Sequence, residues 1–264
     1  MPKPTFRTAL VTGASAGLGA EFARQLAAAG TDLVLVARRE EKLAALAEEL
    51  GKAHHVGVEV LQADLSTEEG MARVERRAGE LTGLDLLVNN AGYGGRGGFA
   101  TGDAANHIAM LKVHIDTTVR LTRAALPGML DRARGGIINV ASIAAFSPFS
   151  GPMYSGTKSF LVMFSENLHG EVRDKGVSVQ ALCPGFTHTE FHEVAGMDKS
   201  ALPKGLWMTA ERVVRISLRR LGRGALCIPG LRNKTIAFLT RCPLTLAAVR
   251  ALGRTRFIRK KAGR

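Results

Sequence analysis

A tyrosine, a lysine and an upstream serine form a set of side chains suited to proton transfer. Tyr154 and Lys158 are four residues apart in a segment with helical periodicity, so both are expected on one helix face. A neighbouring ammonium favours the phenolate of a tyrosine and makes it a usable acid or base. Ser142, twelve residues before Tyr154, could donate a hydrogen bond to a substrate oxygen. The set predicts chemistry at a carbonyl or an alcohol, although a Tyr-x-x-x-Lys pair also arises by chance on protein surfaces.

A glycine-rich turn follows the first apolar run of the chain. It reads Thr-Gly-Ala-Ser-Ala-Gly-Leu-Gly over residues 12–19 and precedes an amphipathic helical pattern. Glycines allow a tight turn and the close approach of a phosphate, and a helix N-terminus attracts negative charge. The alternative is a plain strand-to-helix turn. The context favours a dinucleotide-binding loop made by Gly13, Ser15, Gly17, Leu18 and Gly19.

Two arginines, Arg38 and Arg39, follow the second β-rich run. Proteins that bind NAD through such a glycine-rich turn usually carry an acidic residue at this place. A guanidinium offers planar, charged donors to a 2′-phosphate. We therefore expect NADP(H) as the cofactor. Glu40 and Glu41 lie next to the arginines and could neutralise them, so NAD(H) remains the less favoured alternative.

Short β-rich runs alternate with helical patterns along most of the chain. This rhythm predicts a single Rossmann-like α/β domain, a doubly wound and mostly parallel sheet with helices on both faces. The expected strands are 7–12, 32–37, 56–62, 85–88, 136–141, 177–182 and 225–228. The expected helices are 17–29, 40–50 stopped by Gly51, 67–80 capped by Ser66, 104–130, 152–174, and 210–221 capped by Thr209.

The chain divides by charge as well as by pattern. The whole chain carries a net charge of +13. The excess lies in residues 212–264, which hold 15 of the 36 lysines and arginines and no acidic residue. We expect a catalytic domain over residues 1–230, with a substrate lid at 186–208, and a basic amphipathic extension over 231–264. The extension could lie on an anionic membrane surface or pack on its own protein. No aromatic stacking platform suggests a nucleic-acid partner.

The motifs together resemble the short-chain dehydrogenase/reductase family over about residues 5–230. The family pattern is matched by the TGxxxGxG turn, Asn89-Asn90-Ala91-Gly92, Ser142, Tyr154-x-x-x-Lys158 and Pro184-Gly185. The resemblance implies an oxidoreductase in which Tyr154 is the acid/base, Lys158 lowers its pKa and binds the ribose, and Ser142 stabilises the substrate oxygen. It further implies adenine contacts by Asp64 and Leu65, ribose contacts by Asn90, Ala91 and Gly92, and nicotinamide contacts by Pro184, Gly185, Thr187 and Thr189. Asp64 could instead cap the loop at Ser66.

One position departs from the family pattern. The family carries an asparagine in the helix after Asn-Asn-Ala-Gly, where it helps to hold a water that links the lysine to solvent; here His114 stands in its place. A neutral imidazole has one donor and one acceptor and could hold such a water. We expect His114 to be a relay residue, with a satisfied interior histidine as the alternative.

The residues expected around the substrate are apolar, and no arginine clamp for an anion is evident. They are Phe146, Phe149, Met153, Phe186, Phe191 and Trp207. A lipophilic ketone is therefore the expected substrate. His188, His192 and Glu193 could suggest a metal, but the closest pair is only His192 and Glu193 and no third ligand is evident, so no metal site is expected.

The lead hypothesis is an NADP(H)-dependent ketoreductase or alcohol dehydrogenase. A non-catalytic NADP(H)-binding sensor, recruited to a membrane surface, is the alternative. A sugar-nucleotide epimerase is disfavoured by the glycine spacing and the chain length. The three cysteines form no disulfide or metal pattern, which favours a reducing, cytoplasmic setting. The resemblance also implies a homodimer or homotetramer built on helices 104–130 and 152–174.

Overall fold

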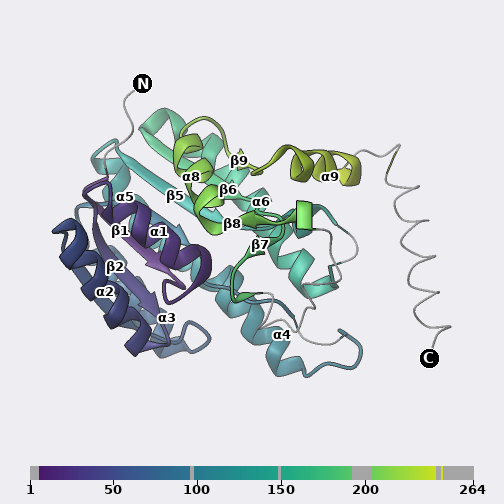
Figure 1. The fold of residues 1–264 in the computed structure, drawn as a ribbon, viewed down its shortest axis with the longest axis horizontal. Helices are drawn as coiled ribbons and strands as arrows, with labels where there is room; N and C mark the ends of the chain where they lie inside the picture. Colours follow the sequence, from purple (N-terminus) through teal and green to yellow (C-terminus); the bar gives the residue numbers. More distant parts are fainter. Residues whose placement is uncertain (1–5, 96–97, 148–149, 192–203, 242–244, 246–264) are drawn as a thin grey trace.

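A parallel sheet of seven strands forms the centre of the protein in the computed structural model, which describes residues 6–95, 98–147, 150–191, 204–241 and 245 (Figure 1). The strand order is β3-β2-β1-β4-β5-β6-β9, and every neighbouring pair is parallel. The strands are β1 Thr8–Thr12, β2 Asp32–Ala37, β3 Val58–Gln62, β4 Leu84–Asn89, β5 Gly135–Val140, β6 Val177–Leu182 and β9 Leu226–Cys227. The predicted doubly wound α/β sheet is confirmed.

Helices cover both faces of the sheet, each with its own apolar core. On one face α1 packs against α2 and α8, and Phe22, Leu43 and Val213 are fully buried there. On the other face α3 packs against α5, around Met71 and Leu121. The helices are α1 Gly17–Ala27, α2 Glu40–His54, α3 Glu68–Glu80, α4 Ala104–Leu111, α5 Thr117–Asp131, α6 Pro152–Val172, α8 Ala210–Arg220 and α9 Leu231–Arg241.

The fold has a switch point between β1 and β4, the two central neighbours of the sheet. From β1 the chain proceeds outward through β2 and β3, and from β4 it proceeds the other way through β5 and β6. Ligands of open α/β sheets bind at the carboxyl ends of the strands beside such a point. The glycine-rich turn follows β1 and Asn89-Asn90-Ala91-Gly92 follows β4, so both motifs lie at this place.

Several element boundaries differ from the sequence prediction. Gly51 does not stop α2, which continues to His54 and ends at His55 in a left-handed conformation with φ of 55°. Thr67, not Ser66, caps α3, because its side chain accepts from the N–H of Gly70. The predicted helix 104–130 is two helices, α4 and α5, joined by a π-helical turn at Lys112–Asp116. Thr209 caps α8 as expected.

The segment predicted as a lid contains short structure at both of its ends. Strand β7, Thr187–His188, pairs in parallel with β8, Met208–Thr209, in a separate two-stranded sheet, and Lys204–Leu206 forms a 3-10 turn. Residues 192–203 lie outside the described part, and so does Phe149. The pairing of β7 with β8 nevertheless fixes where this segment leaves and rejoins the catalytic face.

The start of the basic extension is the helix α9. One side of α9 packs on the domain, where Asn233 and Ala237 are buried and Asn233 donates to the carbonyl of Pro229. On its other side Leu231 and Phe238 are 80% and 68% exposed. Residues 242–244 and 246–264 lie outside the described part. Within the described residues, no helix has the length and apolar character needed to cross a membrane.

Candidate active site

The glycine-rich turn adopts a backbone that requires its glycines. Gly13 and Gly17 have φ of +67° and +57°, in the left-handed region that side chains disfavour. A Cβ on Gly19 would lie 2.3 Å from the carbonyl oxygen of Gly13, so only a glycine fits at this position. At Gly17 a Cβ would be 3.2 Å from Cβ of Thr189. The turn therefore lies against the segment expected beside the nicotinamide.

A single hydroxyl joins this turn to the segment after β4. Thr12 Oγ1 donates to the carbonyl of Val88 at 3.3 Å and accepts from the N–H groups of Asn90 and Ala91 at 2.9 and 3.0 Å. The side chain of Asn90 donates back to the carbonyls of Thr12 and Gly13. Asn90 thus has a supporting role in the turn that the motif alone does not reveal. Sequence reasoning missed Thr12, although it is the first residue of the motif.

Arg39 holds the outer edge of the turn. Its Nε donates to Ser15 Oγ at 3.1 Å, and its Nη1 donates to Glu190 at 2.9 Å. Lys42 binds the other oxygen of Glu190 at 3.1 Å, and the pKa of Glu190 is lowered by its hydrogen bonds to Arg39 and Lys42. Arg38 is exposed. Its positive charge helps to lower the pKa of Asp64 and opposes the burial that raises the pKa of Tyr93. The two arginines therefore face different neighbours, and Lys42 and Glu190 are additions to the predicted set.

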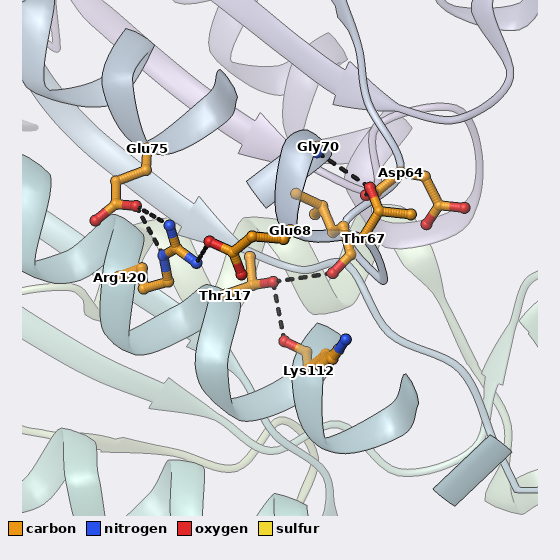
Figure 2. Close-up of polar contacts among 9 residues, drawn as sticks. Asp64, Thr67, Glu68, Gly70, Glu75, Lys112, Thr117 and Arg120 are labelled. Atoms are coloured by element: carbon orange, nitrogen blue, oxygen red, sulfur yellow. Dashed lines mark hydrogen bonds and ion pairs between the residues drawn. The ribbon is translucent and has the colours of Figure 1, made fainter. Parts of the chain in front are cut away.

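Asp64 and Leu65 lie at the end of β3, where Asp64 has the loop-capping role considered as an alternative. Asp64 Oδ1 accepts from the N–H and the hydroxyl of Ser66 at 2.9 and 2.8 Å. Burial opposes the charge of Asp64, but these bonds and the charge of Arg38 outweigh it and lower the pKa of the carboxyl. The carbonyl of Leu65 accepts from Thr117 Oγ1, which also donates to the carbonyl of Lys112 (Figure 2).

The same view shows how α3 and α5 are held together. Arg120 on α5 lies between two acidic side chains of α3, with its guanidinium 2.6 Å from Glu68 and 2.6 Å from Glu75 (Figure 2). Because a bidentate guanidinium fixes orientation as well as distance, this bridge sets the position of the first turn of α5. Together with the contact between Thr117 and Leu65, this bridge joins the start of α5 to α3 and to the segment after β3.

The three residues predicted to do chemistry converge at the carboxyl end of the sheet. Ser142 follows β5, while Tyr154 and Lys158 occupy successive turns of α6. Lys158 Nζ lies 5.7 Å from the centre of the Tyr154 ring and donates to the carbonyl of Val140 at 2.9 Å. Ser142 hydrogen-bonds the tyrosine side chain, and its Oγ also accepts from the N–H of Ala144 at 3.1 Å. A phenol, an ammonium and a hydroxyl thus share one place.

Burial acts on both titrating groups of this site. Desolvation raises the pKa of Tyr154 to about 12, against the opposing effect of its hydrogen bond with Ser142. Desolvation also lowers the pKa of Lys158 to about 8. Each shift disfavours a charge, as expected where water is excluded. The phenol is therefore protonated at neutral pH, and the ammonium is easier to discharge than an exposed lysine. The expectation that Lys158 lowers the pKa of Tyr154 is not met in this structure, where burial dominates and Lys158 is not among the groups that shift this pKa.

His114 is 1% exposed and lies beside these residues, on the π-helical turn. Its Nε2 accepts from the N–H of Tyr93 at 3.1 Å, and its Nδ1 is 2.9 Å from Thr157 Oγ1. The ring of His114 is 6.1 Å from that of Tyr154, edge to face. Burial and the charge of Lys158 lower the pKa of His114 well below its usual value. Thr157 was not singled out from the sequence, because nothing in its spacing distinguishes it.

The remaining predicted residues lie around this centre. The carbonyl of Pro184 accepts from the N–H of Ile143, and Thr187 donates to the carbonyl of Gly185. Gly185 packs against Asn233 of α9, since a Cβ there would be 2.3 Å from its Oδ1. On the substrate side, aromatic rings form two groups: Phe191 is 6.0 Å from Tyr154, and Trp207 stacks on His188 and tilts against Phe186. Among the described residues no cluster of three or more His, Cys, Asp or Glu side chains could hold a metal ion.

Comparison with known proteins agrees with this geometry. The family model for short chain dehydrogenase matches residues 7–199. A very-long-chain 3-oxoacyl-CoA reductase from Anas platyrhynchos is 34% identical over 81% of this chain and 68% of its own length. A short-chain dehydrogenase from Sphingobium yanoikuyae, solved in complex with NADPH, is 33% identical and superimposes with a TM-score of 0.81, covering 96% of this chain and 95% of that one.

A bulky-bulky ketone specific alcohol dehydrogenase from Comamonas testosteroni superimposes with a TM-score of 0.78 at 29% identity, covering 96% of this chain and 94% of that one. Both solved structures therefore share the overall fold of this chain. With the sheet order, the glycine-rich turn and the serine, tyrosine and lysine in one place, the chain belongs to the short-chain dehydrogenase/reductase family of oxidoreductases.

Proposed function

We propose that this protein is an NADP(H)-dependent reductase or dehydrogenase that interconverts a lipophilic ketone and its secondary alcohol. The observation that carries the proposal is the convergence of Tyr154, Lys158 and Ser142 at the carboxyl end of the sheet, where Lys158 is buried and the other two are partly exposed. These three groups supply a proton, a positive charge and a hydrogen-bond donor, which is the set that a carbonyl needs as it becomes an alkoxide.

The residues present fit a phosphorylated dinucleotide. The left-handed turn at Gly13 and Gly17 presents backbone close to the N-terminus of α1, which suits a pyrophosphate. Ser15 and Arg39 form a donor pair at the outer edge of the turn, and Arg38 is exposed beside them, which suits a 2′-phosphate. When bound, NADPH would supply a hydride to the carbonyl carbon. The residues expected to hold it are Gly13, Ser15, Gly17, Leu18, Gly19, Arg38, Arg39, Asp64, Leu65, Asn90, Ala91, Gly92, Tyr154, Lys158, Pro184, Gly185, Thr187 and Thr189.

The chain's own groups handle the proton. In reduction, the phenol of Tyr154 donates its proton to the substrate oxygen while Ser142 donates a hydrogen bond to the same oxygen. Lys158 stabilises the phenolate that remains, through its positive charge, and is held in place by the carbonyl of Val140. Because the pKa of Tyr154 is raised to about 12 in the cofactor-free protein, the phenol carries its proton throughout the neutral range. At neutral pH the phenol therefore holds the proton that the reduction step requires.

The substrate is proposed to be lipophilic because the side chains near Tyr154 are aromatic. Phe191 faces the tyrosine ring, and Trp207 with Phe186 forms a second aromatic group. Two relatives carry names that fit this character, a 3-oxoacyl-CoA reductase and an alcohol dehydrogenase for bulky ketones. A panel of carbonyl substrates, run with NADPH and NADH side by side, measures both the chain-length preference and the cofactor preference.

The variant Tyr154→Phe tests the activity. Turnover is expected to fall by about 10³-fold or more, since the proton donor is removed, while NADPH binding measured by fluorescence stays within about twofold. Unchanged turnover would contradict the assigned chemistry. If the wild-type protein binds NADPH tightly and reduces nothing across the panel, the non-catalytic sensor becomes the better description.

A second proposal concerns the surface of α9. Leu231, Phe238 and Leu239 are exposed on this helix, and it lies in the part of the chain with no acidic residue. An exposed apolar face among cations suits an anionic lipid surface. We expect the full chain to sediment with vesicles containing phosphatidylserine, and Leu231→Ser with Phe238→Ser to release it. Equal sedimentation with uncharged vesicles, or no loss in the variant, would contradict this proposal.

The outer face of α6 is proposed to contact a second copy of the chain. Phe160 stacks on Phe164, and with Met163 and Leu168 they line an apolar groove on this helix. Phe160 and Met163 are exposed, and the family resemblance implies a dimer or tetramer through this helix and α5. Sedimentation velocity is expected to give a dimer or a tetramer for the wild type and a smaller species for Met163→Glu. A monomeric wild type would contradict the proposal.

A further inference from the structure

The hydrogen bonds of His114 define the state of its ring. A backbone N–H can only donate, so Nε2, which faces the N–H of Tyr93, carries no proton. The proton of the neutral ring is then on Nδ1 and is donated to Thr157 Oγ1. The hydroxyl of Thr157 in turn donates a hydrogen bond to the carbonyl oxygen of Tyr154 at 3.0 Å. Three bonds thus run in one direction, from Tyr93 through His114 and Thr157 to the backbone of the catalytic tyrosine.

This arrangement leaves no nitrogen of His114 ready to take up a proton. Protonation of Nε2 would turn the bond from Tyr93 into a donor facing a donor. It would also place a second positive charge near Lys158, whose Nζ and the Nε2 of His114 both border Gly92, at 3.5 and 2.9 Å from where a Cβ would stand. Burial and the charge of Lys158 both disfavour a charged ring, the backbone contact with Tyr93 only partly offsets them, and no acidic side chain is among the groups that act on His114.

The π-helical turn explains how the ring reaches this position. The N–H of Thr117 bonds the carbonyl of Lys112, five residues earlier, and the side chain of Thr117 donates to the same carbonyl and to that of Leu65 (Figure 2). Thr118 Oγ1 donates to the carbonyl of His114 at 2.9 Å. The wider turn is therefore closed by two hydroxyls, and it presents His114 between the segment after β4 and α6.

We propose that His114 is a positioning residue, a permanently neutral link that holds Gly92 and Tyr93 at a fixed distance from the helical turn carrying Tyr154 and Lys158, and that it does not relay protons. The kinetic part of this inference rests on the proposed function, while the state of the ring does not. In this role the imidazole acts through the backbone of Tyr154, by way of Thr157, and the geometry of the phenol and the ammonium depends on it.

The state of the ring is tested by NMR on the full-length protein labelled with ¹⁵N at histidine. His114, assigned by comparison with His114→Asn, is expected to remain neutral and protonated at Nδ1 from about pH 5.5 to about pH 8.5. Titration of His114 within this range, or a proton on Nε2, would overturn the proposal. This result does not depend on any turnover, so it stands apart from a failure of the proposed function.

The link to Tyr154 is tested by Thr157→Val, which keeps the shape of the side chain and removes the hydroxyl. We expect kcat to fall about five- to tenfold with the affinity for NADPH nearly unchanged, and the melting temperature to fall because the buried Nδ1–H of His114 loses its acceptor; Thr157→Ser is expected to restore both. Thr31→Val is the matched control, because it also removes a buried threonine hydroxyl that donates to a backbone carbonyl, that of Phe6, just before β2 and away from the site. Its kcat is expected within about twofold of wild type. Equal losses in both variants, or no rescue by serine, would overturn the link.

The relay role is tested by His114→Asn, which keeps a donor near Thr157 and cannot titrate. The pH profile of kcat is expected to keep its wild-type shape while its level falls about threefold to tenfold. A lost or displaced limb of that profile would identify His114 as a proton carrier and overturn the proposal. If Tyr154→Phe retains full turnover, the proposed function fails, and the NMR result alone then decides the state of His114.

Discussion

The two ends of the predicted cofactor cleft are built in different ways. At the catalytic end Lys158 and His114 are 4% and 1% exposed, and each has a hydrogen-bond partner supplied by the fold. At the 2′-phosphate end the side chains of Arg39 and Glu190 are each 45% exposed and pair with one another across the glycine-rich turn. The first end is fixed by packing, while the second is a cluster of hydrated charges.

The difference indicates what each end can contribute. Buried groups in fixed positions can stabilise developing charge strongly, because no water competes and no reorganisation is needed. Exposed charges interact weakly in pairs and are screened by salt, so they suit selection between similar ligands more than catalysis. Substitutions at the buried end are therefore expected to change rates by orders of magnitude, and those at the exposed end to change affinities by smaller factors.

The largest effect is expected from Lys158→Met. Turnover should fall by about 10³-fold or more, because the phenolate of Tyr154 loses its stabilising charge. At the same time the free energy of unfolding of the cofactor-free protein at pH 7 should rise by about 1–2 kcal/mol, since a buried charge is removed at the cost of one bond to Val140. Urea unfolding and steady-state kinetics measure the two effects.

The stability gain has a defined pH dependence. The folded-state pKa of Lys158, about 8, lies below its unfolded value of 10.5, so the wild-type protein releases a proton on folding between these values. Wild-type stability therefore rises from pH 8 toward pH 10.5, and the advantage of the methionine variant shrinks over the same window. An advantage that stays constant with pH would contradict the burial argument.

A smaller loss, about 10²-fold in kcat, is expected for Ser142→Ala, because one donor to the substrate oxygen is removed. Ser155→Ala is the control: Ser155 is on the same helix as Tyr154, and its hydroxyl donates to the carbonyl of Ser147 instead of facing the phenol. Its kcat should stay within about twofold of wild type. Similar losses in both variants would mean that the effect comes from the loop geometry.

At the exposed end, Arg39→Met is expected to weaken NADPH binding about tenfold and to leave NADH binding within about twofold. Arg24→Met is the matched control, since Arg24 is equally exposed and also paired with a glutamate, Glu49, but on a remote surface. Titration calorimetry with both cofactors makes the comparison. An equal loss for NADPH and NADH would assign Arg39 to the shape of the turn and not to the phosphate.

The smallest effect is expected from Glu190→Gln. Removing this carboxylate frees Arg39 and Lys42 from a competing anion, so NADPH should bind about two- to threefold tighter, with NADH unchanged. Raising the ionic strength should reduce the difference between the variant and the wild type. Weaker NADPH binding in the variant would mean that Glu190 orients Arg39 and does not compete for it.

Features that depend on local patterns could be predicted from the sequence, while features that depend on distant partners could not. The strands along the chain and the places of Ser142, Tyr154 and Lys158 follow from apolar periodicity and motif spacing, because both are local patterns. The roles of Thr157 and Thr12 depend on partners far apart in the chain, so no spacing announces them. The π-helical turn also escaped prediction, because a single inserted residue leaves the apolar pattern of helix 104–130 almost unchanged.

Competition between equivalent residues accounts for the smaller differences. Ser66 and Thr67 are both good capping residues, and Asp64 decides between them by taking the hydroxyl of Ser66. At Gly51 a helix stop was expected, but glycine is tolerated inside a helix at a modest cost, and the left-handed residue came at His55 instead. Glu190 lies in the segment predicted as a lid, and only its contact with Arg39 in the structure shows that it borders the glycine-rich turn.

The hydroxyl of Thr12 holds the turn after β1 at a fixed distance from the segment after β4. One oxygen atom touches the end of β4 and two amides after it, while its own backbone begins the glycine-rich turn. This oxygen therefore fixes the distance between the turn proposed to bind the pyrophosphate and the segment proposed to contact the ribose. The substitution Thr12→Val would keep the shape of the side chain and the strands in place but remove these hydrogen bonds. The two segments could then move apart, and a bound dinucleotide could no longer contact both at once.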